Sequence, residues 1–186
     1  MTLTEMKKKV LGMIEELDIN TESLTSDQDI EVKLNDTINQ VMYELARMRK
    51  LPDYVEMEVN EGDLVRFEDI ASESGYDVYQ IDRVSGVSFE YRAEGTVIKV
   101  LESGTLEIDY FKYPEMITEK TKVNYEFELP ADALEILPYG VAGDLLKTDV
   151  STEYGAIFSN RYEQMLQRLD SRYSMGTFSI EGGVHM

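Results

Sequence analysis

The feature that most constrains this chain is its hydrophobic period, which changes twice. Residues 1–52 carry apolar side chains at three- and four-residue spacing, the period of a helix buried on one face. From about residue 53 the period becomes two, as in Val55-Glu56-Met57-Glu58-Val59, which indicates a strand with one wet face. Helical spacing returns at Pro130 and continues to about Tyr173. The sequence therefore predicts an α+β fold in which a β-rich segment interrupts a helical body.

The two N-terminal helices have start signals as well as apolar faces. Thr2-x-x-Glu5 and Thr25-x-x-Gln28 both have the form of a capping box, in which a Thr hydroxyl and a Glu or Gln side chain satisfy the first free N–H groups. Pro52 is expected to end the second helix soon after Leu51. The residues expected on the two apolar faces are Leu3, Met6, Val10, Met13 or Ile14, and Leu17, and then Leu34, Ile38, Val41, Met42, Leu45 and Met48.

The middle of the chain alternates strand patterns with turn signals. Glycines at 62, 75, 86, 95 and 104 each follow a polar residue, as in tight turns. Short turns join antiparallel neighbours, so Val97–Leu101 and Thr105–Tyr113 are predicted to pair as a hairpin. The pattern predicts one small antiparallel sheet over about Asp53 to Leu129.

The second helical half contains residues that should shape its packing. Pro130 suits a first helical position, and Pro138 is expected to bend or split the helix that follows. Gly140 and Gly143 should let a neighbouring helix approach closely. The last helix, from about Ser151, carries an apolar stripe that we expect to be core: Tyr154, Phe158, Tyr162, Met165, Leu166, Leu169 and Tyr173.

These patterns combine into one architecture. Residues 1–52 and 130–173 are predicted to form a four-helix-bundle-like core, and residues 53–129 a central antiparallel β-rich insertion. Residues 174–186 contain three glycines and no helical period, so we expect a flexible C-terminal tail there.

The charge of the chain excludes ordinary nucleic-acid binding. Its 186 residues include 18 Lys and Arg against 37 Asp and Glu, a net charge of −19. Duplex binding depends on cations that displace counterions from phosphates, so such a chain should repel DNA. The acidic surface then has two interpretations. It either keeps the protein in solution or faces DNA that must slide past without sticking.

Catalytic and metal-binding patterns are missing from the sequence. The chain has no cysteine, and its one histidine, His185, is next to last, where a base or ligand would be poorly held. Phosphate-binding loops and EF-hand loops are absent, and the acidic clusters Glu61–Asp63 and Glu68–Asp69 are expected to be exposed loops. The sequence also lacks a secretory signal and an apolar run long enough to cross a membrane. We therefore expect a non-enzymatic protein without cofactor or metal.

The second half of the chain resembles a known family. A strand ends in Ile108-Asp109-Tyr110-Phe111-Lys112-Tyr113-Pro114, and a short link reaches Leu129-Pro130. Then follow the helical Ile136-Leu137-Pro138-Tyr139-Gly140-Val141-Ala142, the segment Leu145-Leu146-Lys147-Thr148-Asp149, and a final helix with Arg161-Tyr162-Glu163-Gln164-Met165-Leu166. This pattern is similar to the head–tail connector adaptors, or head completion proteins, of tailed bacteriophages and prophages.

The resemblance implies a role in assembly. Such proteins form dodecameric rings beneath the portal protein, extend the DNA channel in the virion neck and dock tail or neck proteins after assembly in the bacterial cytoplasm. For this chain it implies a portal-docking tail with Tyr173, Met175, Phe178, Ile180 and Val184. It leaves open which acidic residues line the channel, those of the β-rich middle or of the first two helices, and whether the free chain is a monomer.

Two alternatives remain at this point. The chain could be another neck or tail-completion protein, which would bind tail tube components in preference to the portal. It could also be an acidic cytosolic binding module, such as a DNA mimic that inhibits a basic protein.

Overall fold

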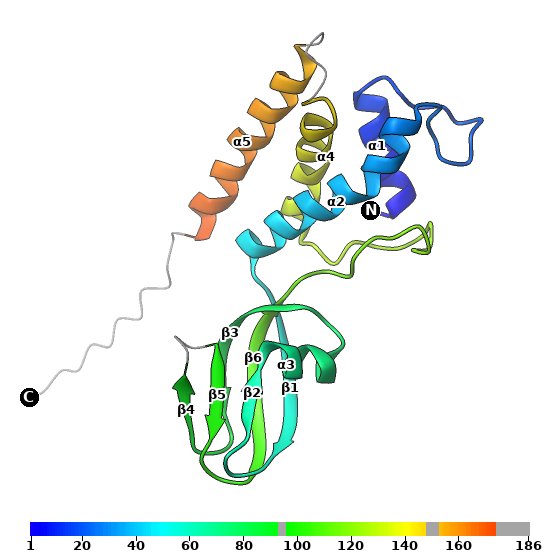
Figure 1. Cartoon of the computed structure of the whole chain (residues 1–186). Helices are drawn as coiled ribbons and strands as arrows, with labels where there is room; N and C mark the ends of the chain where they lie inside the picture. Colours follow the sequence, from blue (N-terminus) through cyan, green and yellow to red (C-terminus); the bar gives the residue numbers. More distant parts are fainter. Residues whose placement is uncertain (93–95, 148–152, 174–186) are drawn as a thin grey trace, which may run out of the picture.

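The computed structural model describes residues 1–92, 96–147 and 153–173, which form two parts (Figure 1). The first part, the helical body, contains α1 (Leu3–Met13), α2 (Gln28–Arg49), α4 (Ala131–Leu145), α5 (Tyr154–Tyr173) and the link 113–130. The second part, the β module, runs from β1 to β6. The chain enters this module directly from α2 and leaves it toward α4, so the module is an insertion in the helical body.

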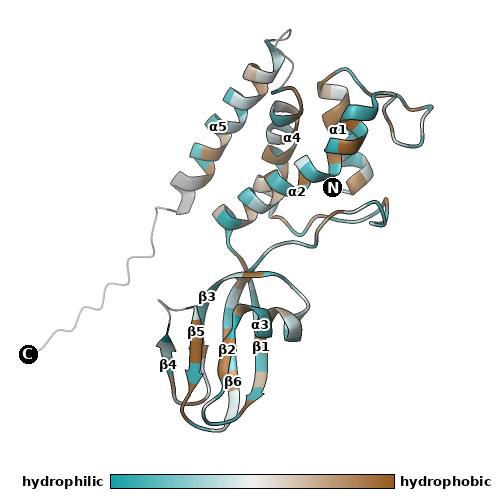
Figure 2. Ribbon diagram, in the orientation of Figure 1, coloured by the Kyte–Doolittle hydropathy of each residue, from teal (hydrophilic) through white to brown (hydrophobic). Residues whose placement is uncertain are grey.

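The β module consists of two three-stranded antiparallel sheets, with strand orders β1-β6-β3 and β2-β5-β4. Its elements are β1 (Leu51–Val59), β2 (Leu64–Arg66), α3 (Phe67–Ser74), β3 (Val78–Ser85), β4 (Phe89–Arg92), β5 (Val97–Val100) and β6 (Gly104–Lys112). One core takes buried residues from both sheets and α3: Val55, Val59, Val65, Ile70, Val84, Ile98, Val100, Leu106, Ile108 and Tyr110. Because the core lies between the sheets, each sheet turns its other face outward. Figure 2 shows hydrophobic residues along β5, the central strand of the second sheet.

The prediction of one sheet over residues 53–129 was wrong. The strands lie between Leu51 and Lys112, in two sheets, and the expected hairpin of 97–101 with 105–113 does not form. β5 pairs with β2 and β4, whereas β6 pairs with β1 and β3. Each is the central strand of its own sheet, so both edges of β5 and β6 are already occupied. Period and turn signals show where strands lie but not which neighbours they take.

The prediction of a four-helix-bundle-like core was also wrong. The structure is mixed, with α4 at the centre of the helical body and α1, α2 and α5 each packed against it. The link 113–130 takes part of the space that a bundle helix would occupy, because Ile117, Phe127 and Leu129 are buried in the same core as α1, α2 and α4.

Asn39 explains why an irregular link can enter this core. Its side-chain nitrogen donates to the Ile117 carbonyl, and its oxygen accepts from the Ile117 N–H, both at 2.8 Å. The two backbone groups that burial would leave unsatisfied therefore have partners. Backbone bonds from Leu3 N–H to the Tyr125 carbonyl (2.8 Å) and from Thr4 N–H to the Val123 carbonyl (3.2 Å) fasten the rest of the link to the start of α1.

One of the two predicted capping boxes is confirmed. Thr2 Oγ1 accepts from the Glu5 N–H, and the Thr2 N–H donates to Glu5 Oε2. The box at Thr25 was wrong: Asp27 is the N-cap of α2, and its carboxylate accepts from the N–H groups of Asp29 and Ile30. A carboxylate beside the helix start gains from the helix dipole as well as from the hydrogen bonds.

The expected close approach at Gly140 and Gly143 is confirmed. A Cβ on Gly140 would lie 2.6 Å from Val41 Cγ1 and 2.8 Å from the Tyr162 ring, and one on Gly143 would lie 2.7 Å from Ser159 Oγ. α2 and α5 therefore contact the backbone of α4. Pro138 does not split the helix, since α4 runs continuously from Ala131 to Leu145.

The apolar stripe of α5 is only partly core. Leu169 is buried and packs into the core of the helical body, while Phe158, Tyr162, Met165 and Leu166 are half-buried against it. Tyr154 is 56% exposed, so the stripe does not continue into the core at this end. α5 lies on the outside of the body beside α4 (Figure 1). No helix among the described residues is long and apolar enough to cross a membrane.

The close contact at Gly140 leads to a stability prediction. We expect Gly140→Ala to lower the free energy of unfolding by about 1 to 3 kcal/mol, because the added methyl group overpacks the contact with α2 and α5. The matched control is Gly12→Ala in α1, where a Cβ would meet nothing within 4 Å. This control should raise stability by about 0.5 to 1 kcal/mol, since alanine favours helix. Urea denaturation followed by circular dichroism measures both, and equal effects of the two substitutions would contradict the prediction.

Candidate assembly surfaces

The residues predicted to dock a portal lie almost wholly outside the described part of the chain. Met175, Phe178, Ile180 and Val184 belong to residues 174–186, as does His185. Tyr173 is the last residue of α5, and its side chain is not described. The docking role of these residues stays a prediction, and the surfaces below come from the remaining chain.

The acidic clusters singled out in the sequence have structural roles. Asp63 accepts from the Asn60 N–H at 2.8 Å in an exposed turn, and Asp69 accepts from the Arg66 N–H at 2.8 Å in the first turn of α3. Glu68–Asp69 thus begin a helix, where negative charge is favourable, instead of forming the expected loop. Across residues 1–92, 96–147 and 153–173, no three His, Cys, Asp or Glu side chains converge as metal ligands.

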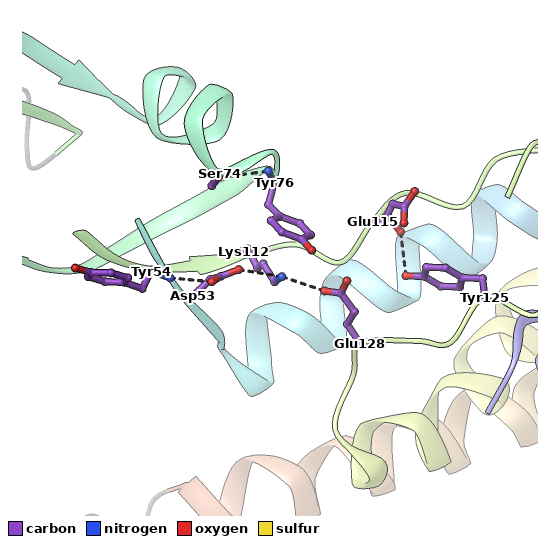
Figure 3. A network of polar contacts seen from close by, with 8 residues as sticks. All are labelled: Asp53, Tyr54, Ser74, Tyr76, Lys112, Glu115, Tyr125 and Glu128. Atoms are coloured by element: carbon purple, nitrogen blue, oxygen red, sulfur yellow. Dashed lines mark hydrogen bonds and ion pairs between the residues drawn. The ribbon is translucent and has the colours of Figure 1, made fainter. Parts of the chain in front are cut away.

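The two parts of the molecule meet at a half-buried cation, Lys112, at the end of β6 (Figure 3). Its ammonium lies 3.0 Å from Asp53 Oδ2 on β1 and 3.2 Å from Glu128 Oε2 on the link. The same nitrogen lies 3.3 Å from the centre of the Tyr76 ring, a cation–π contact. One side chain therefore ties together the β module, the turn after α3 and the link of the helical body.

These contacts change the ionisation of the groups involved. Burial alone would lower the pKa of Lys112, but its hydrogen bonds to Asp53 and Glu128 raise the pKa to about 12. Burial would raise the pKa of Asp53, and the bonds from Lys112 and the Tyr54 N–H outweigh it, so this pKa is lowered. Tyr125 lies on the link near Glu128. Its burial is the larger cause and the negative charges of Glu128 and Glu115 the smaller one, and together they raise the pKa of Tyr125 to about 12.

An aromatic cluster completes this joint. The ring of Tyr113 stacks on Tyr43 of α2, with centroids 4.6 Å apart, and lies 4.9 Å from Tyr79 of β3. Arg47 donates a hydrogen bond to the Tyr113 hydroxyl, and the Tyr79 hydroxyl donates to the Ala46 carbonyl at 3.2 Å. Side chains of α2, β3 and the link thus interlock at the joint and fix the β module against the helical body.

The outward side of the first sheet is acidic. We call Glu56, Glu58, Glu107 and Asp109 the acidic sheet face; they alternate with core residues along β1 and β6. Glu56 stands directly opposite Glu107 in the strand register, and like charges in this position destabilise a sheet. Most of their partners are hydroxyl groups: Tyr54 donates to Glu56 at 2.6 Å, Thr105 to Glu58 at 2.7 Å and Ser85 to Glu107 at 2.9 Å. Arg83 on β3 is the register partner of Asp109 on β6, and it places a cation at the edge of this face.

The hydroxyl partners leave the negative charge in place. Hydrogen bonding to Glu56 raises the pKa of the Tyr54 phenol to about 12, so Tyr54 stays a neutral donor at physiological pH. A neutral donor satisfies the carboxylate oxygens without cancelling their charge. The acidic sheet face is therefore a lasting negative surface and not a set of internal ion pairs.

The outward side of the second sheet has the opposite character. The register aligns Arg66, Val97 and Arg92 in one row and Leu64, Lys99 and Glu90 in the next. We call these six residues the basic sheet face. Glu90 pairs with Arg92 at 2.6 Å and with Lys99 at 3.6 Å, so three cations stand against one carboxylate among the described residues of this face. Leu64 is 45% exposed there. The face joins positive charge to an exposed apolar side chain.

A surface pocket of about 380 Å³ lies between α1, the loop before α2 and the link 113–130. Burial lowers the pKa of Lys7, which lines it, although the charge of Glu31 opposes this effect. The side-chain oxygen of Asn35 is buried there without a hydrogen-bond partner. Glu22 and Glu119 also line the pocket. Because a lysine and two glutamates lie around it, the pocket favours neither an anionic nor a cationic ligand.

Sequence reasoning found one of the two sheet faces in part. The alternation in β1 and β6 marked their acidic residues as solvent-facing. The basic sheet face was missed because Arg66, Arg92 and Lys99 come from separate strands of an acidic chain. Only the pairing of β2, β5 and β4 brings them together. In comparisons with known proteins, no family model and no curated protein matched the chain.

The role of Lys112 can be tested by its removal. We expect Lys112→Met to lower the free energy of unfolding by about 1 to 3 kcal/mol at neutral pH, because Asp53 and Glu128 lose their shared charged partner. The control is Lys147→Met, whose side chain is 77% exposed and which should change stability by less than about 0.5 kcal/mol.

This difference should depend on pH. The pKa of Asp53 is lowered in the folded state, so its contribution is complete above the unfolded value of about 3.9 and is lost as pH falls through the folded value. The stability gap between wild type and Lys112→Met should thus narrow below about pH 4. Urea titrations at several pH values measure it, and a gap that stays constant down to the acid transition would contradict the assignment.

Proposed function

We propose that this chain is a non-enzymatic structural protein of the virion of a tailed phage or prophage, a head–tail connector adaptor. It assembles as a ring under the portal protein, extends the DNA channel in the neck and docks tail components. Its partners are the portal, tail or neck proteins and further copies of itself, as a dodecamer in the virion. It uses no cofactor, and DNA passes it without sequence-specific binding.

The acidic sheet face is the observation that carries this proposal. Glu56 and Glu107 face each other across β1 and β6 on an exposed surface, an arrangement that lowers the stability of the module. The surface keeps this unfavourable repulsion between carboxylates and pairs little of its negative charge with cations. We therefore infer that it acts through its charge. Such a surface suits electrostatic recognition of a protein partner and repulsion of nucleic acid.

The distribution of carboxylates supports a DNA channel. Glu56 and Glu107 are exposed on the β module, and Asp29 and Asp36 are exposed on α2 of the helical body. A ring whose axis is bordered by either part would therefore present a negative wall. Phosphates are repelled by such a wall, so DNA slides through instead of binding.

The joint supports a platform role. Lys112 and the aromatic cluster around Tyr113 fix the β module on the helical body. Each part can then contact a different neighbour in the neck while the two keep a constant relation. The predicted docking tail, residues 174–186, comes after α5 in the sequence, and α5 itself lies on the outside of the helical body (Figure 1).

A DNA mimic is the second candidate, because the same acidic sheet face could imitate a row of phosphates. That function predicts tight binding to a basic nucleic-acid enzyme of the host, with affinity that collapses as salt rises. It predicts no binding to the portal. Parallel pull-downs against a portal protein and against basic host proteins separate the two functions.

The adaptor proposal predicts ring formation on the portal. Full-length protein mixed with the portal protein of the same genome should give a collar below the portal ring in electron micrographs. Deletion of Ser174–Met186 should abolish docking and leave the circular-dichroism spectrum and thermal unfolding of the described fold unchanged. A full-length chain that never binds the portal would overturn the proposal, whereas a truncated chain that still docks would overturn only the tail assignment.

A further inference from the structure

The β module carries opposite charges on its two outward sides. The acidic sheet face belongs to the sheet β1-β6-β3, and the basic sheet face to the sheet β2-β5-β4. The core of the module, with Val55, Ile98 and Leu106, separates them. Because the sheets pack through this core, the two outward faces of one chain cannot touch each other. Among the described residues the charged side chains Glu56, Glu107, Arg66 and Arg92 are exposed, so both faces can be covered by another molecule.

The two faces are complementary in more than net charge. Each is presented by neighbouring antiparallel strands, and strand spacing is about 4.8 Å in both, so charges on adjacent strands can meet in rows. Each face also has one large exposed side chain with apolar surface: Tyr54 is 47% exposed beside Glu56, and Leu64 is 45% exposed beside Lys99. Tyrosine is enriched at the buried centres of interfaces, where a hydrophobic contact is surrounded by polar pairs.

We infer that the acidic sheet face of one copy binds the basic sheet face of a second copy. In this contact Arg66, Arg92 and Lys99 of one chain meet Glu56, Glu107 and Asp109 of the next. Arg92 and Lys99 then give up part of their ion pairing with Glu90 and pair instead with carboxylates of the neighbouring chain. The inference rests on the proposed function, because it names the partner of the acidic sheet face in the ring.

The geometry of the contact makes it head-to-tail. Since the two faces differ, every copy that binds through one face still offers the other, and the contact repeats until it closes in a ring. A two-fold dimer would instead pair identical faces, which the like charges of Glu56 and Glu107 disfavour. Carboxylates of the first two helices, such as Asp29 and Asp36, then remain free to face DNA.

Charge reversal on each face tests the contact. One variant carries Arg92→Glu with Lys99→Glu, and the other carries Glu56→Lys with Glu107→Lys. We expect each variant alone to assemble at least about tenfold more weakly than wild type, because like faces then meet. An equimolar mixture should restore assembly, since the reversed face of each variant fits the reversed face of the other. The matched control, Asp29→Lys with Asp36→Lys on α2, should assemble like wild type.

Sedimentation of the full-length chain at low salt, with and without the portal, provides the readout. Circular dichroism verifies the fold of each variant. Assembly of either variant alone at wild-type strength would overturn the inference, and so would a mixture that fails to assemble. A wild-type chain that stays monomeric under both conditions would also overturn it.

Cross-linking distinguishes this contact from the adaptor function itself. The chain has no cysteine, so Glu107→Cys combined with Lys99→Cys introduces the only thiols. Oxidation should give a ladder of disulfide-linked oligomers, and the control pair Asp36→Cys with Lys99→Cys should give none. Collars on the portal without a ladder would overturn the contact and leave the function standing. A ladder without portal binding would support the contact and overturn the adaptor function.

Discussion

The contact of Lys112 with Asp53, Glu128 and Tyr76 is the constraint on which the arrangement of the molecule depends. The chain enters the β module at Leu51 and leaves it at Lys112, and these residues are paired in the strand register. A single crossing point of this kind would act as a hinge if its charges were unmatched. Here one cation, 13% exposed, holds a carboxylate from each part, and the ring of Tyr113 stacks on α2 beside it. The insertion is thereby a fixed part of the body.

A fixed insertion gives its two outward faces defined directions. The acidic sheet face keeps Glu56 opposite Glu107 at a cost in stability, and its hydroxyl partners satisfy oxygens without removing charge. The basic sheet face collects three of the few cations of an acidic chain around Leu64. Opposite faces on one rigid unit are what a repeating contact requires, and this connects the charge pattern to assembly in the proposed adaptor.

Local signals predicted much of the secondary structure and little of its arrangement. The capping box at Thr2, the alternation in β1 and β6 and the small residues Gly140 and Gly143 all had the expected consequences. The bundle-like core and the single sheet were wrong because both depend on partners. The link 113–130 lies in the core because the Asn39 side chain satisfies the backbone groups of Ile117. A hydrophobic period does not reveal this role of a polar residue. α5 kept an amphipathic pattern although much of its stripe is only half-buried.

The sequence by itself determined that helices flank a β-rich insertion, that the chain is strongly acidic and that its alternating strands have wet carboxylate faces. These properties follow from spacing and composition, which are local. The tertiary structure decided which strands share a sheet, which residues form the joint and that Arg66, Arg92 and Lys99 gather on one face. The physical reason is that β pairing and ion pairing join residues distant in the chain. Their partners are selected by the burial of a common core, and no periodicity along the sequence records that selection.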